Sequence, residues 1–312
     1  MPRPFRFTVQ GGPRASAEAE FLADGAALPA YAREVETLGY EELYSYDHLG
    51  AIDPFPPLVL AASATERLRV GPLVLNNEFH HPALLARTAA TVDRMTGGRL
   101  VLGLGTGYDE SEHESMGTPI RPPGPRVARF AESLAVLRAL LDNGAVDHDG
   151  EHHRVHIADL GVRPVQPRVP FLVGGHGRRV VGLAAQYADI FQFTGIVHGP
   201  GGAPGGAGFA IDQVVERGRW LTEAAGERDA AIERSVLVQF AAVGPDAPGA
   251  EDLAARFSLD AGVVAETPFV LSGSVEQVVD RVQRIRERTG TSHWVVRDPK
   301  GFAPVVDALR GR

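Results

Sequence analysis

Eight short runs of β-branched and aromatic residues recur along the chain, and most are followed by a segment with helical periodicity. This alternation is typical of β/α units whose strands form a parallel sheet. No change in composition divides the chain, so the pattern favours a closed (β/α)₈ TIM barrel over a doubly wound sheet, with residues 1–312 as one domain. The runs predicted to be strands are Phe5–Val9, Glu42–Tyr46, Arg69–Leu75, Leu100–Leu104, Pro170–Val173, Asp189–Phe193, Ser235–Val243 and His293–Val296.

The segments between these strands place apolar residues three and four positions apart, as helices packed on one face require. The predicted helices are Leu28–Leu38, Pro57–Thr65, Ala83–Met95, Val127–Leu141, Arg178–Tyr187, Ile211–Ala225, Val275–Arg288 and Phe302–Leu309. Along the sequence, predicted strands four and five are separated by about twice the usual length of one β/α unit. We therefore expect insertions there, a loop over 108–124 and an excursion over 147–156, and a further glycine-rich loop over 195–210 after strand six, which could be a lid.

Composition excludes several function classes. The chain has no cysteine, which removes disulfides, thiolate nucleophiles, iron–sulfur clusters and cysteine zinc sites. Its net charge is −8 and no long basic run occurs, so nucleic acid is not an expected partner. No apolar run reaches the roughly 18 residues of a membrane helix, and the first residues do not look like an export signal. We expect a soluble, cytoplasmic protein with a small-molecule substrate.

In a barrel, residues that directly follow the strands meet at one end, called the mouth here. The side chains and turns delivered there are Gln10, Asp47, His48, Asn76, Asn77, Thr106, Gly107, Tyr108, Gly174, Gly175, His176 and Thr194. This set has one carboxylate and no His-x-His after the first strand, so we predict no metal site and rank a metal-dependent hydrolase last. His152, His153 and His156 lie on the excursion and are predicted to be surface residues.

Two glycine-rich segments could serve a cofactor. FLVGGHGRR places a glycine turn between a strand and a helix whose free N–H groups could bind a phosphate monoester beside Arg178, although a plain β/α turn fits equally well. LVLGLGTGYDE lacks the dinucleotide fingerprint, and small residues there would let a strand end pack tightly.

Three segments in order resemble the bacterial luciferase-like flavin and deazaflavin oxidoreductases, most closely the branch that depends on coenzyme F420. They are GYEELYSYDHL, RLRVGPLVLNNEFHHPALLARTAATVDRMTGGRLVLGLGTGY and PFLVGGHGRR, and the similarity extends from Phe5 to Val296. The resemblance implies a barrel whose mouth binds the deazaflavin or isoalloxazine ring, with the ribityl phosphate at the glycine turn after strand five. It also implies a non-proline cis peptide between Leu73 and Val74.

Carried over by position, the resemblance assigns catalysis to His48 and Asp47. The cofactor-binding residues that it implies are Asp47, Leu73, Val74, Asn76, Thr106, Gly107, Gly174, Gly175, His176, Gly177 and Arg178. Tyr108 stands where sugar-phosphate dehydrogenases of the family have a glutamate proton donor, so that substrate is not carried over. Asp109 or Glu110 could supply a carboxylate instead.

The expected reaction is hydride transfer between C5 of the deazaflavin and a small organic substrate. His48 is the expected acid/base because an unperturbed histidine titrates at about 6.5, and Asp47 would either set its tautomer or bind the ring. An FMN-dependent monooxygenase supplied by a separate reductase, and a noncatalytic flavin-binding protein, are the alternatives. A homodimer and a monomer both remain open.

Overall fold

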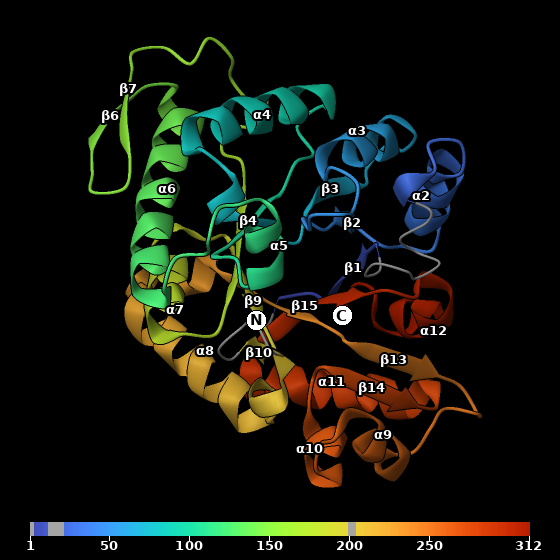
Figure 1. Cartoon of the computed structure of the whole chain (residues 1–312). Helices are drawn as coiled ribbons and strands as arrows, with labels where there is room; N and C mark the ends of the chain where they lie inside the picture. The colour runs from blue at the N-terminus through green and yellow to red at the C-terminus, as the bar shows by residue number, and fades with distance from the viewer. Residues whose placement is uncertain (1–2, 12–21, 199–203) are drawn as a thin grey trace.

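The computed structural model describes residues 3–11, 22–198 and 204–312, and its central feature is a parallel sheet that closes on itself (Figure 1). The strands, in sheet order, are β3 (Arg69–Pro72), β2 (Glu42–Ser45), β1 (Arg6–Gln10), β15 (Thr291–Val296), β12 (Glu233–Leu237), β9 (Ile190–Phe193), β8 (Phe171–Gly175), β5 (Leu102–Gly105) and β4 (Leu75–Asn76). β3 and β4 belong to one predicted strand. A parallel bridge from Val70 to Leu100 and the pairing of Leu75 with Leu104 close the barrel on either side of the interruption.

Helices form a ring around these strands in Figure 1. They are α2 (Leu28–Thr37), α3 (Phe55–Ser63), α4 (Pro82–Met95), α5 (Glu110–Ser115), α6 (Pro123–Asn143), α7 (Arg178–Tyr187), α8 (Ile211–Ala225), α9 (Ala250–Phe257), α10 (Ala261–Glu266), α11 (Val275–Thr289) and α12 (Pro299–Leu309). Short 3₁₀ turns lie at η1 (Asn77–Phe79), η3 (Gly206–Gly208) and η4 (Gly226–Ala231). In the described ranges no helix is both long and apolar enough to cross a membrane.

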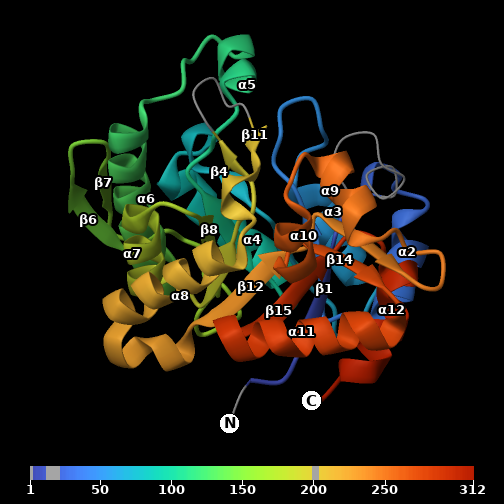
Figure 2. The same cartoon turned by 90° about the horizontal axis from the view of Figure 1, so that it is seen from below.

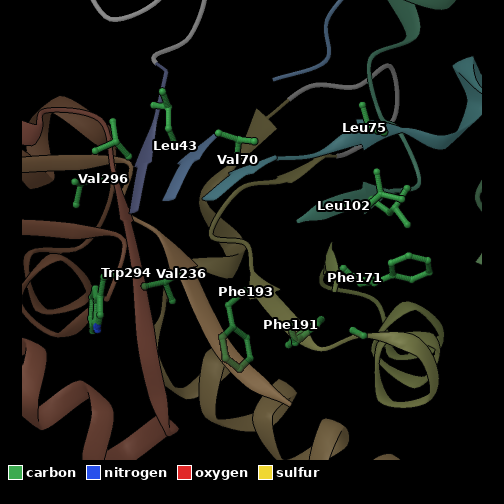
Figure 3. Close-up of a cluster of buried hydrophobic side chains, with 14 of the residues drawn as sticks. Leu43, Val70, Leu75, Leu102, Phe171, Phe191, Phe193, Val236, Trp294 and Val296 are labelled. Carbon is green, nitrogen blue, oxygen red and sulfur yellow. The ribbon is translucent and has the colours of Figure 1, made fainter. Parts of the chain in front are cut away.

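The main core lies between strands and helices, because alternate strand residues point outward (Figure 3). Phe191 and Phe193 on β9 and Trp294 on β15 are fully buried there. Burying such a side chain contributes about 1.5–3 kcal/mol, so this layer supplies much of the drive to close the barrel.

The first residues of β1, β2 and β3, at the end of the barrel opposite the mouth, are charged. Glu42, the first residue of β2, is fully buried and accepts a hydrogen bond from Arg6 at 3.1 Å, while its ion pair with Arg69 measures 3.2 Å. Burial alone would raise the pKa of Glu42, but the charges of Arg6, His293 and Arg69 outweigh it and lower that pKa to about 2. His293, on β15, is also fully buried, and burial together with Arg6 lowers its pKa to about 3.

The structure corrects one sequence prediction about a segment and adds detail to two others. The seventh run is not one strand: only its first part is β12, whereas β13 (Phe240–Val243) pairs with β14 (Val270–Gly273) in a separate sheet. The loop over 108–124 contains α5. The excursion is a hairpin of β6 (Val146–Asp149) and β7 (Arg154–Ile157).

Two further predictions have mixed outcomes. His153 is buried, 5% exposed, and bonds Ser133 at 3.0 Å, so it is not a surface histidine, whereas His156 is exposed. In the glycine-rich loop, β10 (Val197–His198) pairs with β11 (Pro204–Gly205), and the rest of the lid prediction lies partly outside the described residues.

Candidate active site

The mouth of the barrel is the upper edge in Figure 2, where α5 and β11 lie, and both chain ends lie at the opposite edge. Asp47, just after β2, joins two parts of this mouth. Its Oδ2 accepts the backbone N–H of Asn76 at 2.9 Å and lies 3.0 Å from Nε2 of His80. The Asp47 side chain is only 11% exposed, so these bonds fix the ends of β2 and β4 against each other.

His48 forms hydrogen bonds with different residues from those that Asp47 contacts. Its Nδ1 lies 2.8 Å from Oε1 of Glu112, and its Nε2 lies 3.2 Å from the hydroxyl of Tyr108. A carboxylate only accepts, so Nδ1 carries a proton and Nε2 of the neutral ring is left to exchange one with Tyr108. The prediction that Asp47 sets the His48 tautomer is therefore wrong, because Glu112 occupies that position. Whether Asp47 contacts a cofactor ring stays a prediction.

α5 brings Glu112 to the histidine. Asp109 caps this short helix, since its Oδ1 accepts the backbone N–H groups of Ser111 at 3.0 Å and Glu112 at 3.3 Å. The Asp-x-x-Glu spacing is a capping signature, and this is the sequence signal that could have revealed the helix. Glu112 is 8% exposed, and a carboxylate so deeply buried needs a partner, which His48 provides.

The ligand-type atoms of His48, Asp109 and Glu112 lie within 4.8 Å of one another. Two of them already bond each other, and Asp109 is engaged with helix N–H groups. This cluster is thus a hydrogen-bonded pair beside a helix cap.

Asn76 is held on both sides of its amide. Its Nδ2 donates to Nε2 of His113 at 3.0 Å, and Nδ1 of the same ring donates to the Thr118 carbonyl at 3.2 Å, which fixes the tautomer of His113. Gly107 has φ +78° and packs on this amide, where a Cβ would lie 2.0 Å from Asn76 Oδ1. The glycine is therefore required by both backbone conformation and space.

The break between β3 and β4 contains a cis peptide bond from Leu73 to Val74, at the position that the resemblance implied. The Leu73 carbonyl accepts a hydrogen bond from Nε2 of Gln10 at 2.7 Å. Val74 packs over β5, where a Cβ on Gly105 would lie 2.7 Å from its methyl group. The glycines of LVLGLGTGYDE therefore make room for a neighbouring strand. This confirms the prediction that small residues in this segment let a strand end pack tightly.

The turn after β8 offers backbone groups more than side chains. Gly177 is the N-cap of α7 without a side-chain cap, and a Cβ there would meet nothing within 4 Å. The Arg178 side chain is 72% exposed and lies 3.7 Å from Glu223 of α8, so it is directed along the surface. Burial lowers the pKa of His176, and the charge of Arg217 lowers it further.

This end of the mouth fits a phosphate group. The first N–H groups of α7 have no side-chain acceptor at the N-cap, and the Thr194 hydroxyl after β9 is buried without a hydrogen-bond partner among the described residues. Free N–H groups at a helix start and an unpartnered hydroxyl are what a phosphate oxygen requires. Thr106 is partly buried after β5. Contacts of Thr106, Gly174 and Gly175 with a cofactor stay predictions.

The sequence profile described as luciferase-like monooxygenase matches residues 5–293. The chain belongs to this family. Over 306 aligned residues it is 26% identical to the 5,10-methylenetetrahydromethanopterin reductase of Methanopyrus kandleri, covering 85% of this chain and 87% of that protein. It is 34% identical over 193 residues to the F420-dependent glucose-6-phosphate dehydrogenase of Beutenbergia cavernae, covering 59% of this chain and 56% of that one.

This luciferase-like chain therefore spans only about half the length of some curated relatives that it matches; for a second reductase, from Archaeoglobus fulgidus, the share is 47%. Among solved structures, an F420-dependent secondary alcohol dehydrogenase in complex with an F420-acetone adduct has a TM-score of 0.77 at 18% identity. That match covers 99% of this chain and all of the other. The predicted TIM-barrel fold and the resemblance to the family are both confirmed.

Proposed function

We propose that this chain is an F420-dependent oxidoreductase that transfers a hydride between C5 of the deazaflavin and a small organic substrate. The hydrogen bond between His48 and Glu112 carries the proposal, because it places an oriented acid/base at the mouth. The name of the Beutenbergia relative, which is 34% identical over its aligned part, supports the choice of cofactor.

The residues that would hold the cofactor lie at two ends of the mouth. The end that we assign to the deazaflavin ring is bordered by the Leu73–Val74 peptide, Asp47, Asn76 and Gly107. The turn Gly174–Arg178 would take the ribityl phosphate, mainly through N–H groups at the start of α7. When bound, the deazaflavin supplies a carbon centre that accepts or releases a hydride.

The chain's own task is then to move a proton at the substrate. Glu112 holds His48 with a proton on Nδ1, so Nε2 is the atom that can accept or return a second proton. Tyr108 bonds that nitrogen, and burial with the charges of Asp109 and Glu112 raises the pKa of Tyr108 to about 12. Its hydroxyl therefore stays protonated near neutral pH and can pass a proton between substrate and His48.

Two measurements test this assignment. Fluorescence titration with F420 and with FMN identifies the cofactor. The His48→Ala variant should lose most turnover while binding the cofactor almost as tightly as the wild type. His156→Ala, which removes an exposed histidine on the β6–β7 hairpin, is the matched control and should leave both unchanged. Unchanged turnover of the His48 variant would remove its assigned role.

The family description favours one second candidate, an FMN-dependent monooxygenase supplied with reduced flavin by a separate reductase. In that case the protein would bind FMN more tightly than F420 and consume O₂ when given reduced FMN. Binding of either cofactor without turnover would instead indicate a noncatalytic flavin-binding protein. A homodimer is a further proposal, which light scattering would test.

A further inference from the structure

Arg217 of α8 is a buried cation at the mouth without an acidic partner. It is 3% exposed, and its Nη1 donates to the Thr194 carbonyl at 2.7 Å. Within residues 3–11, 22–198 and 204–312 no carboxylate lies at ion-pair distance from it. Burial lowers its pKa, and only the charge of neighbouring Glu216 opposes this. An unpaired buried charge is costly, so its retention needs a reason.

The other arginine that is buried in the described part of the chain has a carboxylate partner. Arg129, which is 8% exposed, lies 3.1 Å from Oε1 of Glu78 and also donates to the carbonyls of Asn77 and His80. Arg217 donates a hydrogen bond to one carbonyl, whereas Arg129 is bonded to a carboxylate and two carbonyls. Its guanidinium fork therefore retains donors for another acceptor.

The surroundings of Arg217 place those donors beside the turn after β8. Its charge contributes to the lowered pKa of His176, which lies in that turn. Its carbonyl acceptor belongs to Thr194, directly after β9. β9 pairs with β8, with Phe193 opposite Gly175. A Cβ on Gly208 would lie 3.0 Å from Nη2 of Arg217 and 3.0 Å from the Thr194 carbonyl, so the Gly208 backbone packs closely on this pair. The unpartnered hydroxyl of Thr194 lies on the same residue whose carbonyl Arg217 binds.

We propose that Arg217, the Thr194 hydroxyl and the first turn of α7 form one site for a phosphate group, with Arg217 and not Arg178 as its cation. This proposal deepens the proposed function and rests on it for the identity of the ligand. Guanidinium groups bind phosphate through charge-assisted, often bidentate hydrogen bonds, which would offset the burial of the charge. The phosphate could belong to the cofactor chain or to a phosphorylated substrate.

Ligand pairs that differ in the phosphate test the site. FMN and riboflavin form one pair, and F420 and its phosphate-free deazaflavin form the other. In fluorescence titrations, Arg217→Met should weaken binding of the phosphorylated ligand by about tenfold to a hundredfold, and that of the phosphate-free ligand by less than about threefold. Arg217→Lys should recover part of the loss. Arg219→Met, which removes a cation that is 65% exposed on the same helix as Arg217, is the matched control and should change neither affinity.

Inorganic phosphate separates the two sources and does not depend on cofactor identity. It should raise the melting temperature of the wild type and not that of Arg217→Met. If bound cofactor abolishes this rise, the cofactor phosphate fills the site; if the rise persists, the site takes a substrate phosphate. A protein that binds neither F420 nor FMN would refute the proposed function but would still show this rise.

Equal losses for phosphorylated and phosphate-free ligands would mean that Arg217 only holds the Thr194 segment, and would overturn the site. A phosphate-selective loss in Arg178→Met would do the same. If Arg217→Met fails to fold, Arg217→Lys and the response of the wild type to inorganic phosphate test the proposed site instead. A wild type whose melting temperature does not rise with phosphate would also overturn the proposed site.

Discussion

Replacing Glu112 by glutamine changes one charge at nearly constant shape and should slow turnover. A hydrogen bond to a charged group contributes about 1.5–3 kcal/mol, and the bond to His48 is short at 2.8 Å with Glu112 8% exposed. The His48 side chain is 33% exposed, so we take the lower part of that range. Because 1.4 kcal/mol corresponds to tenfold, kcat should fall about tenfold to thirtyfold.

The mechanism of the loss can be observed directly. A glutamine can donate its N–H to Nδ1 of His48, which would favour the tautomer with the proton on Nε2 and remove the acceptor that Tyr108 uses. Long-range ¹H–¹⁵N correlation spectra of the histidine rings report this tautomer. The assay is steady-state turnover with the cofactor identified by titration, whose affinity should change by less than about twofold.

Glu114→Gln is the control, because Glu114 is exposed on the same helix. It should match the wild type in turnover, cofactor affinity and tautomer. If Glu112→Gln and Glu114→Gln gave equal turnover, or if kcat fell while the His48 tautomer stayed the same, Glu112 would not position the histidine.

Two further outcomes follow from buried groups. Burial lowers the pKa of His293 from about 6.5 in the unfolded chain to about 3 in the fold, and neighbouring cations lower the pKa of Glu42 to about 2, so the unfolded state binds more protons in acid. The free energy of unfolding should therefore fall as pH drops from 6.5 towards 3, by up to about 1.4 kcal/mol per pH unit for each proton; a flat urea-denaturation profile over that range would contradict these shifts. Gly107→Ala should destabilise by about 1–3 kcal/mol and reduce turnover, because its Cβ meets Asn76 and its φ is +78°. Gly117→Ala, at φ +68° with nothing within 4 Å, carries only the conformational cost and should lose less in the same measurement.

Barrel architecture was predictable because local and long-range signals agree in most units. α7 and α8 begin and end at the residues predicted, Arg178–Tyr187 and Ile211–Ala225. The run Ser235–Val243 misled because a continuous apolar stretch does not reveal where one sheet ends and another begins. Its second half is held by Val270–Gly273, a partner that no local pattern indicates.

The sequence predicted only those residues of the candidate site that lie at or directly after the ends of strands. The alternation of strands places His48, Asn76 and Gly175 at the mouth, and they do lie there. Glu112 and Arg217 were missed because both come from helices and reach back over the strand ends, 64 and 23 residues from their partners. Such contacts depend on how a helix is placed on the barrel, which hydrophobic periodicity does not specify.

The ion pairs of Glu42 with Arg6 and Arg69 also limit how ligands can travel. These groups lie at the first residues of β2, β1 and β3, and side chains inside such a barrel pack as a core and do not line a pore. We therefore expect cofactor and substrate to enter and leave through the mouth. The deeper ligand has to arrive first and depart last, an order that product-inhibition patterns would reveal.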